Sequence, residues 1–176
     1  MQTITVKTDV YKFNELSDET KEHCIEQMYD MNVDYDWWES VCYDAEQIGL
    51  KITGFNLDRG SYCSGDFIEY ANEVAELIIK NHGKMCETYK TAQDYLTEYN
   101  KLTKDSLLCV ECEEKAECLG DDDIDTDDID AEFQKSLLED YRIILQKEYD
   151  YLTSEEAIIE TIECNDYNFT IDGKLF

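Results

Sequence analysis

The sequence contains no proline and only two arginines, Arg59 and Arg142, among its 176 residues. The absence of proline favours uninterrupted helices, because proline is the residue that breaks them most strongly. Positive charge is scarce overall: 15 Lys and Arg stand against 43 Asp and Glu, which gives a formal net charge of −28. Proteins that bind nucleic acids or anionic membranes carry basic surfaces. The composition therefore argues against both of these functions and favours a basic macromolecular partner.

Catalytic motifs and long apolar runs are also missing. The sequence has no glycine-rich phosphate loop, GxSxG or HExxH motif, and only two histidines, His23 and His82. No run has transmembrane length, and the first residues lack the apolar core of a signal peptide. We therefore expect a non-enzymatic cytoplasmic protein without a cofactor. An enzyme remains an alternative, in which His82 or Arg59 would line a pocket.

What the sequence does contain is enough apolar material for a core. Hydrophobic residues make up 43% of the chain and aromatic residues 12%, which is too apolar for a disordered chain. The eight cysteines are expected to stay reduced and to serve mainly as small buried apolar residues. A chain of this length suits one domain, so residues 1–176 are predicted to form a single domain.

Strand signals occur at both ends of the chain and in its centre. The residues that alternate are Ile4, Val6, Thr8 and Val10 near the beginning, and Tyr167, Phe169 and Ile171 near the end. Residues 50–68 resemble a β-hairpin, with a bulge at Gly54 and a turn at residues 58–60. We expect these strands to form a small antiparallel sheet.

Helical spacing of apolar residues predicts about six to seven helices packed on that sheet, which makes the fold class α+β. Gly49 is expected to end the second helix. The expected N-terminal caps are Ser17, Asp34 or Asp36, Ser106, and Thr153 in a capping box with Glu156. The apolar face of the fourth helix is expected to carry Met85, Tyr89, Ala92, Leu96 and Tyr99.

An aspartate-rich segment, GDDDIDTDDIDAE, begins at Gly120. Residues 119–131 are predicted to form an acidic flexible loop within the domain. Numbered from Asp121, a calcium-binding EF-hand loop would take ligands from Asp121, Asp123, Asp125, Asp127 and Glu132. Its sixth position is Thr126, where the sharp turn requires glycine, so a calcium site is not favoured.

Zinc is the second metal considered. Cys109, Cys112 and Cys118 lie close together in the sequence, but a single CxxC without a matching second pair is a weak zinc signal. Cys112 also falls on the apolar side of a predicted helix. A packing role is therefore favoured over zinc binding.

Acidic residues are densest between Glu111 and Glu132, where only Lys115 opposes twelve carboxylates. Carboxylates three or four residues apart on a helix lie about 5–6 Å from one another, so an acidic face could occupy a basic nucleic-acid-binding groove. Trp37 could serve as an apolar anchor or lie at the core margin, while Trp38 belongs to an apolar helix face. The predicted contact residues are Glu111, Glu113, Glu114, Glu117, Asp121, Asp122, Asp123, Asp125, Asp127, Asp128 and Trp37.

Three stretches of the chain resemble an uncharacterised family of small acidic proteins encoded by phages and prophages. These stretches are DMNVDYDWWESVCYDAEQIGLKITGFNLDRG, CETYKTAQDYL and SLLEDYRIILQKEYDYLTSEEAIIETIECNDYNFT. The resemblance implies a bacterial cytoplasm as the setting and carries over no catalytic or binding residue. In composition alone, the chain is similar to the DNA-mimicking anti-restriction and anti-CRISPR proteins of phages.

These observations favour an anti-defence protein that inhibits a host CRISPR or restriction nuclease, or another basic nucleic-acid-binding protein, through a DNA-mimicking acidic surface. Besides an enzyme, two alternatives stay open: a calcium- or zinc-binding regulatory domain, and a phage accessory protein that interacts without inhibiting. A homodimer is compatible with both the inhibitor and the accessory protein.

Overall fold

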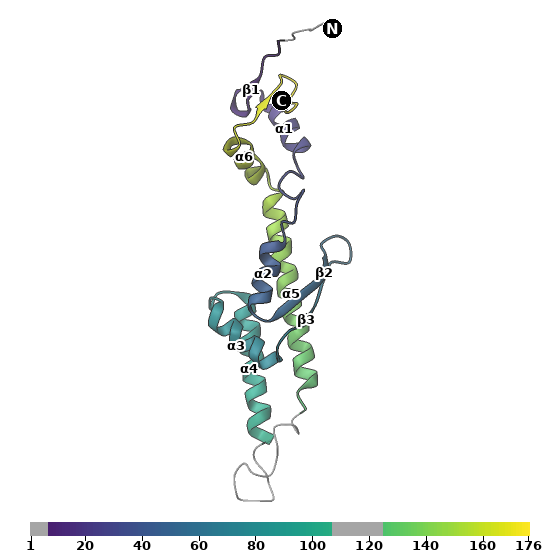
Figure 1. Ribbon diagram of the computed structural model, residues 1–176, viewed down its shortest axis with the longest axis vertical. Coiled ribbons are helices and arrows are strands. Elements are labelled where there is room, and N and C mark those ends of the chain that lie inside the picture. The colour runs from purple at the N-terminus through teal and green to yellow at the C-terminus, as the bar shows by residue number, and fades with distance from the viewer. Residues whose placement is uncertain (1–6, 107–124) are drawn as a thin grey trace, which may run out of the picture. The chain divides into compact units, whose positions relative to one another are not determined.

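The computed structural model describes residues 7–106 and 125–176 of the chain. Within these ranges it contains six α-helices and four short strands, which confirms the predicted α+β class. The strands form two antiparallel two-stranded sheets, one from strands near the chain ends and one from the central hairpin. Figure 1 shows these elements along the chain. Contacts divide the chain into a terminal unit, up to Trp37 and from Lys147 onward, and a central unit, Trp38–Gln146.

In the terminal unit, two strands from opposite ends of the chain pair with each other. Strand β1 (Tyr11–Lys12) runs antiparallel to β4 (Asn168–Phe169). The helices of this unit are α1 (Asp18–Gln27) and α6 (Glu155–Cys164), and a short 3-10 helix, Phe13–Glu15, follows β1. The core residues of this unit are Phe13, Leu16, Cys24, Ile158, Ile162 and Phe169.

In the central unit, helix α2 (Glu39–Gln47) leads into the hairpin of β2 (Leu50–Asn56) and β3 (Tyr62–Phe67). The strand register shifts between Ile52 and Gly54, which confirms the predicted bulge. Gly49 ends α2 with a φ of +83°, and Gly60 turns the hairpin with a φ of +78°; glycine adopts such values without a steric cost. Both glycine positions therefore agree with the expected roles.

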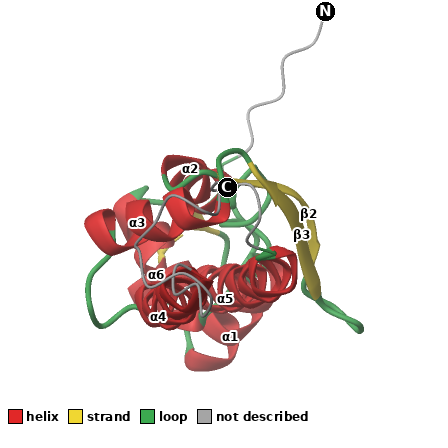
Figure 2. Ribbon diagram, turned by 90° about the horizontal axis from the view of Figure 1, so that it is seen from below, coloured by secondary structure: helices red, strands yellow, loops and turns green. Residues whose placement is uncertain are grey.

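Two long helices of the chain follow this hairpin and the helix α3 (Ala71–Asn81). Helix α4 spans Glu87–Ser106, and α5 spans Asp127–Leu152. Figures 1 and 2 both show α4 beside α5. They run antiparallel, because Thr91 of α4 contacts Asp140 of α5 whereas Tyr95, one turn later, contacts Asp130. The apolar faces contribute Ala92 and Tyr95 of α4 and Phe133, Leu137, Tyr141 and Leu145 of α5.

The structure confirms the predicted start of the first helix but not that of the second. Ser17 caps α1 as predicted, since its Oγ accepts a hydrogen bond from the Thr20 N–H at 3.2 Å. The predicted cap at Asp34 or Asp36 is wrong, because α2 begins only after Trp38. The Trp37 N–H instead bonds to the Tyr35 carbonyl at 2.7 Å, which turns the chain before the helix can start.

The last helix starts one residue later than predicted. Ser154 is its cap and accepts a hydrogen bond from the Ala157 N–H at 3.3 Å. Thr153, the predicted cap, donates its hydroxyl to the Tyr149 carbonyl of α5 instead. This competing bond within the preceding helix explains the shift.

The apolar face of α4 also differs from the prediction. Met85 lies before the helix and is 88% exposed, while Tyr95 is almost fully buried. Ala92 is buried as predicted. The buried face thus follows Thr88, Ala92 and Tyr95, because it is set by the contact with the neighbouring helices.

Three further expectations concern the ends of elements. Residues 7–10 are not in a strand, and the first strand is confined to the two residues that have a partner in β4. Residues 4–6 and the helix expected after Ser106 lie outside the described residues, and Ser106 itself ends α4. The predicted acidic loop, residues 119–131, is too long at its C-terminal side, because helix α5 begins at Asp127.

Candidate functional site

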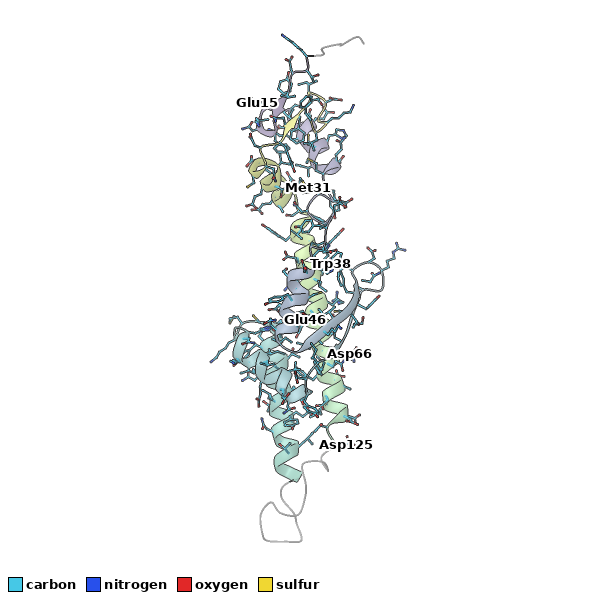
Figure 3. All side chains as sticks on the ribbon, in the orientation of Figure 1. Glu15, Met31, Trp38, Glu46, Asp66 and Asp125 are labelled. Atoms are coloured by element: carbon cyan, nitrogen blue, oxygen red, sulfur yellow. The ribbon has the colours of Figure 1, made fainter. Side chains whose placement is uncertain are left out.

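The predicted acidic contact residues are described only in part. Asp125, Asp127 and Asp128 lie within the structure and are exposed. Figure 3 places Asp125 just before the first turn of α5. The remaining acidic contact residues, Glu111, Glu113, Glu114, Glu117, Asp121, Asp122 and Asp123, lie outside the described residues.

Local hydrogen bonds explain why the aspartates begin a helix here. The Asp125 carboxylate accepts a hydrogen bond from the Asp127 N–H at 3.2 Å. The Thr126 hydroxyl donates to Asp130 Oδ2 at 3.0 Å, and the Asp130 N–H bonds back to the Thr126 carbonyl. Aspartates in a first turn also interact favourably with the positive end of the helix dipole. This N-terminus therefore tolerates its negative charge.

The beginning of α5 and the middle of α4 enclose a groove of about 340 Å³, which we call the α4–α5 groove. Its residues are Thr91, Asp94, Tyr95 and Glu98 of α4 and Asp128, Ile129, Glu132, Phe133 and Ser136 of α5. The central unit contains all nine, so the groove lies within one compact unit. Two of the acidic residues singled out from the sequence, Asp128 and Glu132, are thereby brought together with two others.

Two aromatic rings close the bottom of this groove. The rings of Tyr95 and Phe133 are stacked, with centroids 4.3 Å apart and planes inclined by 17°. Both side chains are almost fully buried. The Tyr95 hydroxyl donates a hydrogen bond to Asp130 Oδ1 at 2.6 Å. Burial and this bond raise the pKa of the Tyr95 phenol, so that it stays a neutral donor.

Carboxylates form a row along each side of the groove. Asp94 and Glu98 are four residues apart on α4, and Asp128 and Glu132 are four residues apart on α5. All four are exposed, and the residues lining the groove include no Lys or Arg. Lys135 lies 3.5 Å from Glu132, but both side chains are largely exposed, and such surface pairs contribute little. The groove is thus an apolar depression between two acidic rows.

Asp94 and Glu98 were missed by the sequence prediction. Their spacing of four residues was visible, but acidic residues at that spacing are common on solvent-facing helix surfaces. Nothing in the sequence indicates that this face of α4 lies opposite the first turns of α5.

Of the two roles considered for Trp37, its burial agrees with the core margin and not with an exposed anchor. Its side chain is only 9% exposed, and its ring centroid lies 5.6 Å from that of Tyr149. Trp38 is half-buried, with its ring 5.7 Å from Phe55 of the hairpin. Because the chain turns at Trp37 before α2 starts, Trp37 is more buried than Trp38, although helical spacing placed Trp38 on the apolar helix face.

The calcium template does not fit the described part of its loop. Helix α5 begins at Asp127, the seventh loop position, whose carbonyl should coordinate the ion. In a helix that carbonyl accepts the N–H four residues later and is not available. No group of three or more potential metal ligands that could hold an ion is found in residues 7–106 and 125–176. The zinc candidates Cys109, Cys112 and Cys118 and the calcium candidates Asp121 and Asp123 lie outside this part of the chain.

His82 belongs to a polar cluster in the central unit, in which His82 and Thr88 are largely covered and Asp44 is exposed. Its Nδ1 is 2.7 Å from the Thr88 hydroxyl and its Nε2 is 3.7 Å from Asp44 Oδ2. The same Asp44 oxygen accepts the Tyr141 hydroxyl at 2.8 Å. The Thr88 hydroxyl is not accessible to a substrate, because the residue is only 2% exposed. These bonds join α2, α4 and α5, so the cluster serves to hold the central unit together. Arg59 is exposed in the hairpin turn.

Three of the described cysteines, Cys24, Cys42 and Cys63, have a raised pKa that disfavours the nucleophilic thiolate. Burial, the nearby Cys42 and Glu139 raise the pKa of the Cys63 thiol to about 11. Burial likewise raises the pKa of Cys24 and Cys42. Cys24 is fully buried, as predicted, and its thiol donates to the Gly173 carbonyl at 3.3 Å. Cys86 and Cys164 are exposed, so the predicted role as buried apolar residues does not extend to all of the cysteines.

Comparison with protein-family models, curated proteins and solved structures finds no match for this chain. Among the described helices, none is both long enough and apolar enough to span a membrane.

Proposed function

We propose that this protein is a non-enzymatic inhibitor that binds a basic, nucleic-acid-binding protein of a bacterial host and blocks its nucleic-acid site by DNA mimicry. A CRISPR or restriction nuclease is the kind of target that suits this function. The proposal places the protein in the bacterial cytoplasm during phage infection. It requires no cofactor.

The observation that carries the proposal is the pair of acidic rows along the α4–α5 groove. Each row has two exposed carboxylates four residues apart, about 5–6 Å from one another on a helix. Nucleic acids likewise present closely spaced negative charges along each strand. A net charge of −28 adds a long-range field that attracts a basic partner and accelerates association. Binding of this kind weakens steeply as salt rises.

Affinity capture from the lysate of a bacterial host tests the proposal. The immobilised protein should retain a basic nucleic-acid-binding protein at low salt and release it at high salt. An added DNA duplex should compete with the immobilised protein for the captured one, because both would occupy the same site. Recovery of no basic partner, or of a complex that neither salt nor DNA disturbs, would overturn the proposal.

A groove variant with matched charge loss sharpens this test. Neutralising the two rows with Asp94→Asn, Glu98→Gln, Asp128→Asn and Glu132→Gln should reduce capture strongly. The control carries Glu19→Gln, Glu22→Gln, Glu26→Gln and Glu76→Gln, which removes the same four charges from α1 and α3. If both variants lose capture to the same extent, net charge and not the groove determines binding.

A further inference from the structure

The α4–α5 groove combines three properties that together specify the shape of an occupant. It has an apolar bottom, it has an acidic row on each side, and it runs between two antiparallel helices. A diffuse acidic surface would have acidic residues but neither the apolar bottom nor the two parallel walls. The three properties together indicate a partner segment that is apolar on one side and basic on its flanks.

The apolar part of the groove is accessible at one residue in particular. Ile129 is half-buried on the first turn of α5, whereas Tyr95 and Phe133 are nearly covered. The stacked rings of Tyr95 and Phe133 line the bottom of the groove, and Ile129 offers the accessible apolar contact beside them. Ion pairs formed next to such apolar material are screened less than pairs in open water.

The length of the groove matches a short helical segment. On α4 its lining runs from Thr91 to Glu98, seven residue steps or about 10 Å along the axis, which is two helical turns. Both acidic rows have a spacing of four residues, so basic side chains three or four residues apart on a docked helix can face them. A helix laid over two neighbouring helices is a common way to bind an amphipathic segment in a groove.

We propose that the α4–α5 groove binds a basic amphipathic helical segment of the partner protein. The apolar side of the segment contacts Ile129, and its Lys and Arg side chains pair with the row of Asp94 and Glu98 and the row of Asp128 and Glu132. This inference rests on the proposed function and adds to it the secondary structure and the chemistry of the contacted part of the partner.

Two synthetic peptides separate groove binding from general charge attraction. The first is a Leu, Lys and Arg peptide of about 14 residues with an apolar helical side, and the second has the same composition in an order that abolishes that side. Fluorescence anisotropy of each labelled peptide measures affinity for the full chain. The amphipathic peptide should bind about tenfold more tightly, because only it can bury apolar side chains on Ile129. Equal affinity for both peptides would overturn the inference.

A pair of exposed acids on α1 provides a matched control for the acidic rows. Glu22 and Glu26 have the same spacing as Asp94 and Glu98 and also border an open cleft, but that cleft has no apolar residue in its lining. Asp94→Asn with Glu98→Gln should weaken the amphipathic peptide about fivefold. Glu22→Gln with Glu26→Gln should change its affinity by less than about twofold.

The substitution Ile129→Asp gives opposite results for the two modes of binding. It makes the protein more acidic, so general charge attraction predicts tighter binding of the basic peptide. Groove binding predicts binding weaker by about tenfold, because the apolar contact is lost. Ile129→Gln, which leaves the charge unchanged, should also weaken binding, and circular dichroism shows whether each variant folds.

The outcomes distinguish failure of this inference from failure of the proposed function. Equal losses from both charge pairs, together with tighter binding by Ile129→Asp, would overturn the groove while leaving capture of a basic partner to be judged by salt and DNA competition. Absence of such a partner from the lysate would overturn the proposed function even if the peptide bound in the groove.

Discussion

The Tyr95 hydroxyl of α4 and the Asp130 carboxylate of α5 are joined by a 2.6 Å hydrogen bond. One aspartate of the acid-rich segment is therefore half-buried and bonded within the protein, unlike the exposed Asp127 and Asp128. The same carboxylate accepts the Thr126 hydroxyl, which ties it to the start of α5. The Tyr95–Asp130 bond thus joins α4 to the first turn of α5 beside the α4–α5 groove.

Removal of this bond should destabilise the central unit. Tyr95→Phe keeps the ring stacked on Phe133 but leaves the half-buried Asp130 carboxyl group without its phenol donor. We expect the free energy of unfolding, measured by urea titration, to fall by about 1–2 kcal/mol. Tyr43→Phe is the control, because Tyr43 is 63% exposed on α2 and the change should have almost no effect. An equal loss for both variants would contradict the role of the Tyr95–Asp130 bond.

Two neighbouring carboxyl groups of α5 should give opposite pH dependences. Burial raises the pKa of Asp140 above its ordinary value of 3.8, so this group holds its proton more tightly in the folded chain. Its contribution to stability is full below the unfolded pKa and declines as pH rises through the folded pKa. In Asp140→Asn the amide oxygen can still accept the Thr91 hydroxyl. The stability of Asp140→Asn relative to the original protein should therefore increase from about pH 3 to about pH 7.

Glu139 supplies the control of opposite sign. Two hydrogen bonds from Arg142, at 2.8 Å and 2.7 Å, lower the pKa of this carboxyl group. Its stabilising contribution is present above the unfolded pKa and is lost as pH falls through the folded pKa. The stability of Glu139→Gln relative to the original protein should thus decrease over the same rise in pH. Urea titrations at several pH values measure both differences, and parallel trends would contradict the assignment.

Trp37 should prove to be a residue of the folded core and not a binding anchor. Trp37→Ala leaves a large cavity beside Tyr149 and should lower the free energy of unfolding by about 3 kcal/mol. Tyr35→Ala, at a position 61% exposed, should cost little. Trp37→Phe retains an aromatic ring and should leave capture of a basic partner unchanged. A selective loss of capture by a stably folded Trp37→Phe would restore the anchor role.

Calcium should act on this protein as a screening cation. Added CaCl2 and MgCl2 should raise the melting temperature by similar amounts, since both reduce repulsion among the excess carboxylates. Asp125→Asn with Glu132→Gln should not remove a calcium-specific increment, because α5 already begins at Asp127. Isothermal titration calorimetry provides the decisive measurement. Saturable calcium binding below about millimolar, lost in this variant, would contradict the prediction.

Local features were predictable because they depend on neighbours in the sequence. The cap at Ser17, the positive φ of Gly49 and Gly60 and the bulge before Gly54 each follow from one or a few adjacent residues. Helical spacing likewise predicted Ala92 as a buried residue of α4. The errors occur where a distant or competing contact decides the outcome. Thr153 bonds to Tyr149 in the preceding helix, so Ser154 becomes the cap of α6.

The candidate site shows the same division. The sequence indicated Asp128 and Glu132 through the density of acidic residues around them. It did not indicate Asp94 and Glu98, because their position beside the first turns of α5 depends on the antiparallel contact of two helices. Asp130 lies in the same acid-rich segment, but its bond to Tyr95 of α4, which no local pattern indicates, leaves it half-buried.

By itself, the sequence determined the α+β class, the strong negative charge and most helix positions, since these follow from composition, periodicity and local hydrogen bonds. Only the tertiary structure decided which carboxylates face one another across a groove and which aromatic rings lie beneath them. Packing of residues far apart in the chain fixes such relationships, as Tyr95 and Phe133 illustrate, and no local pattern encodes them.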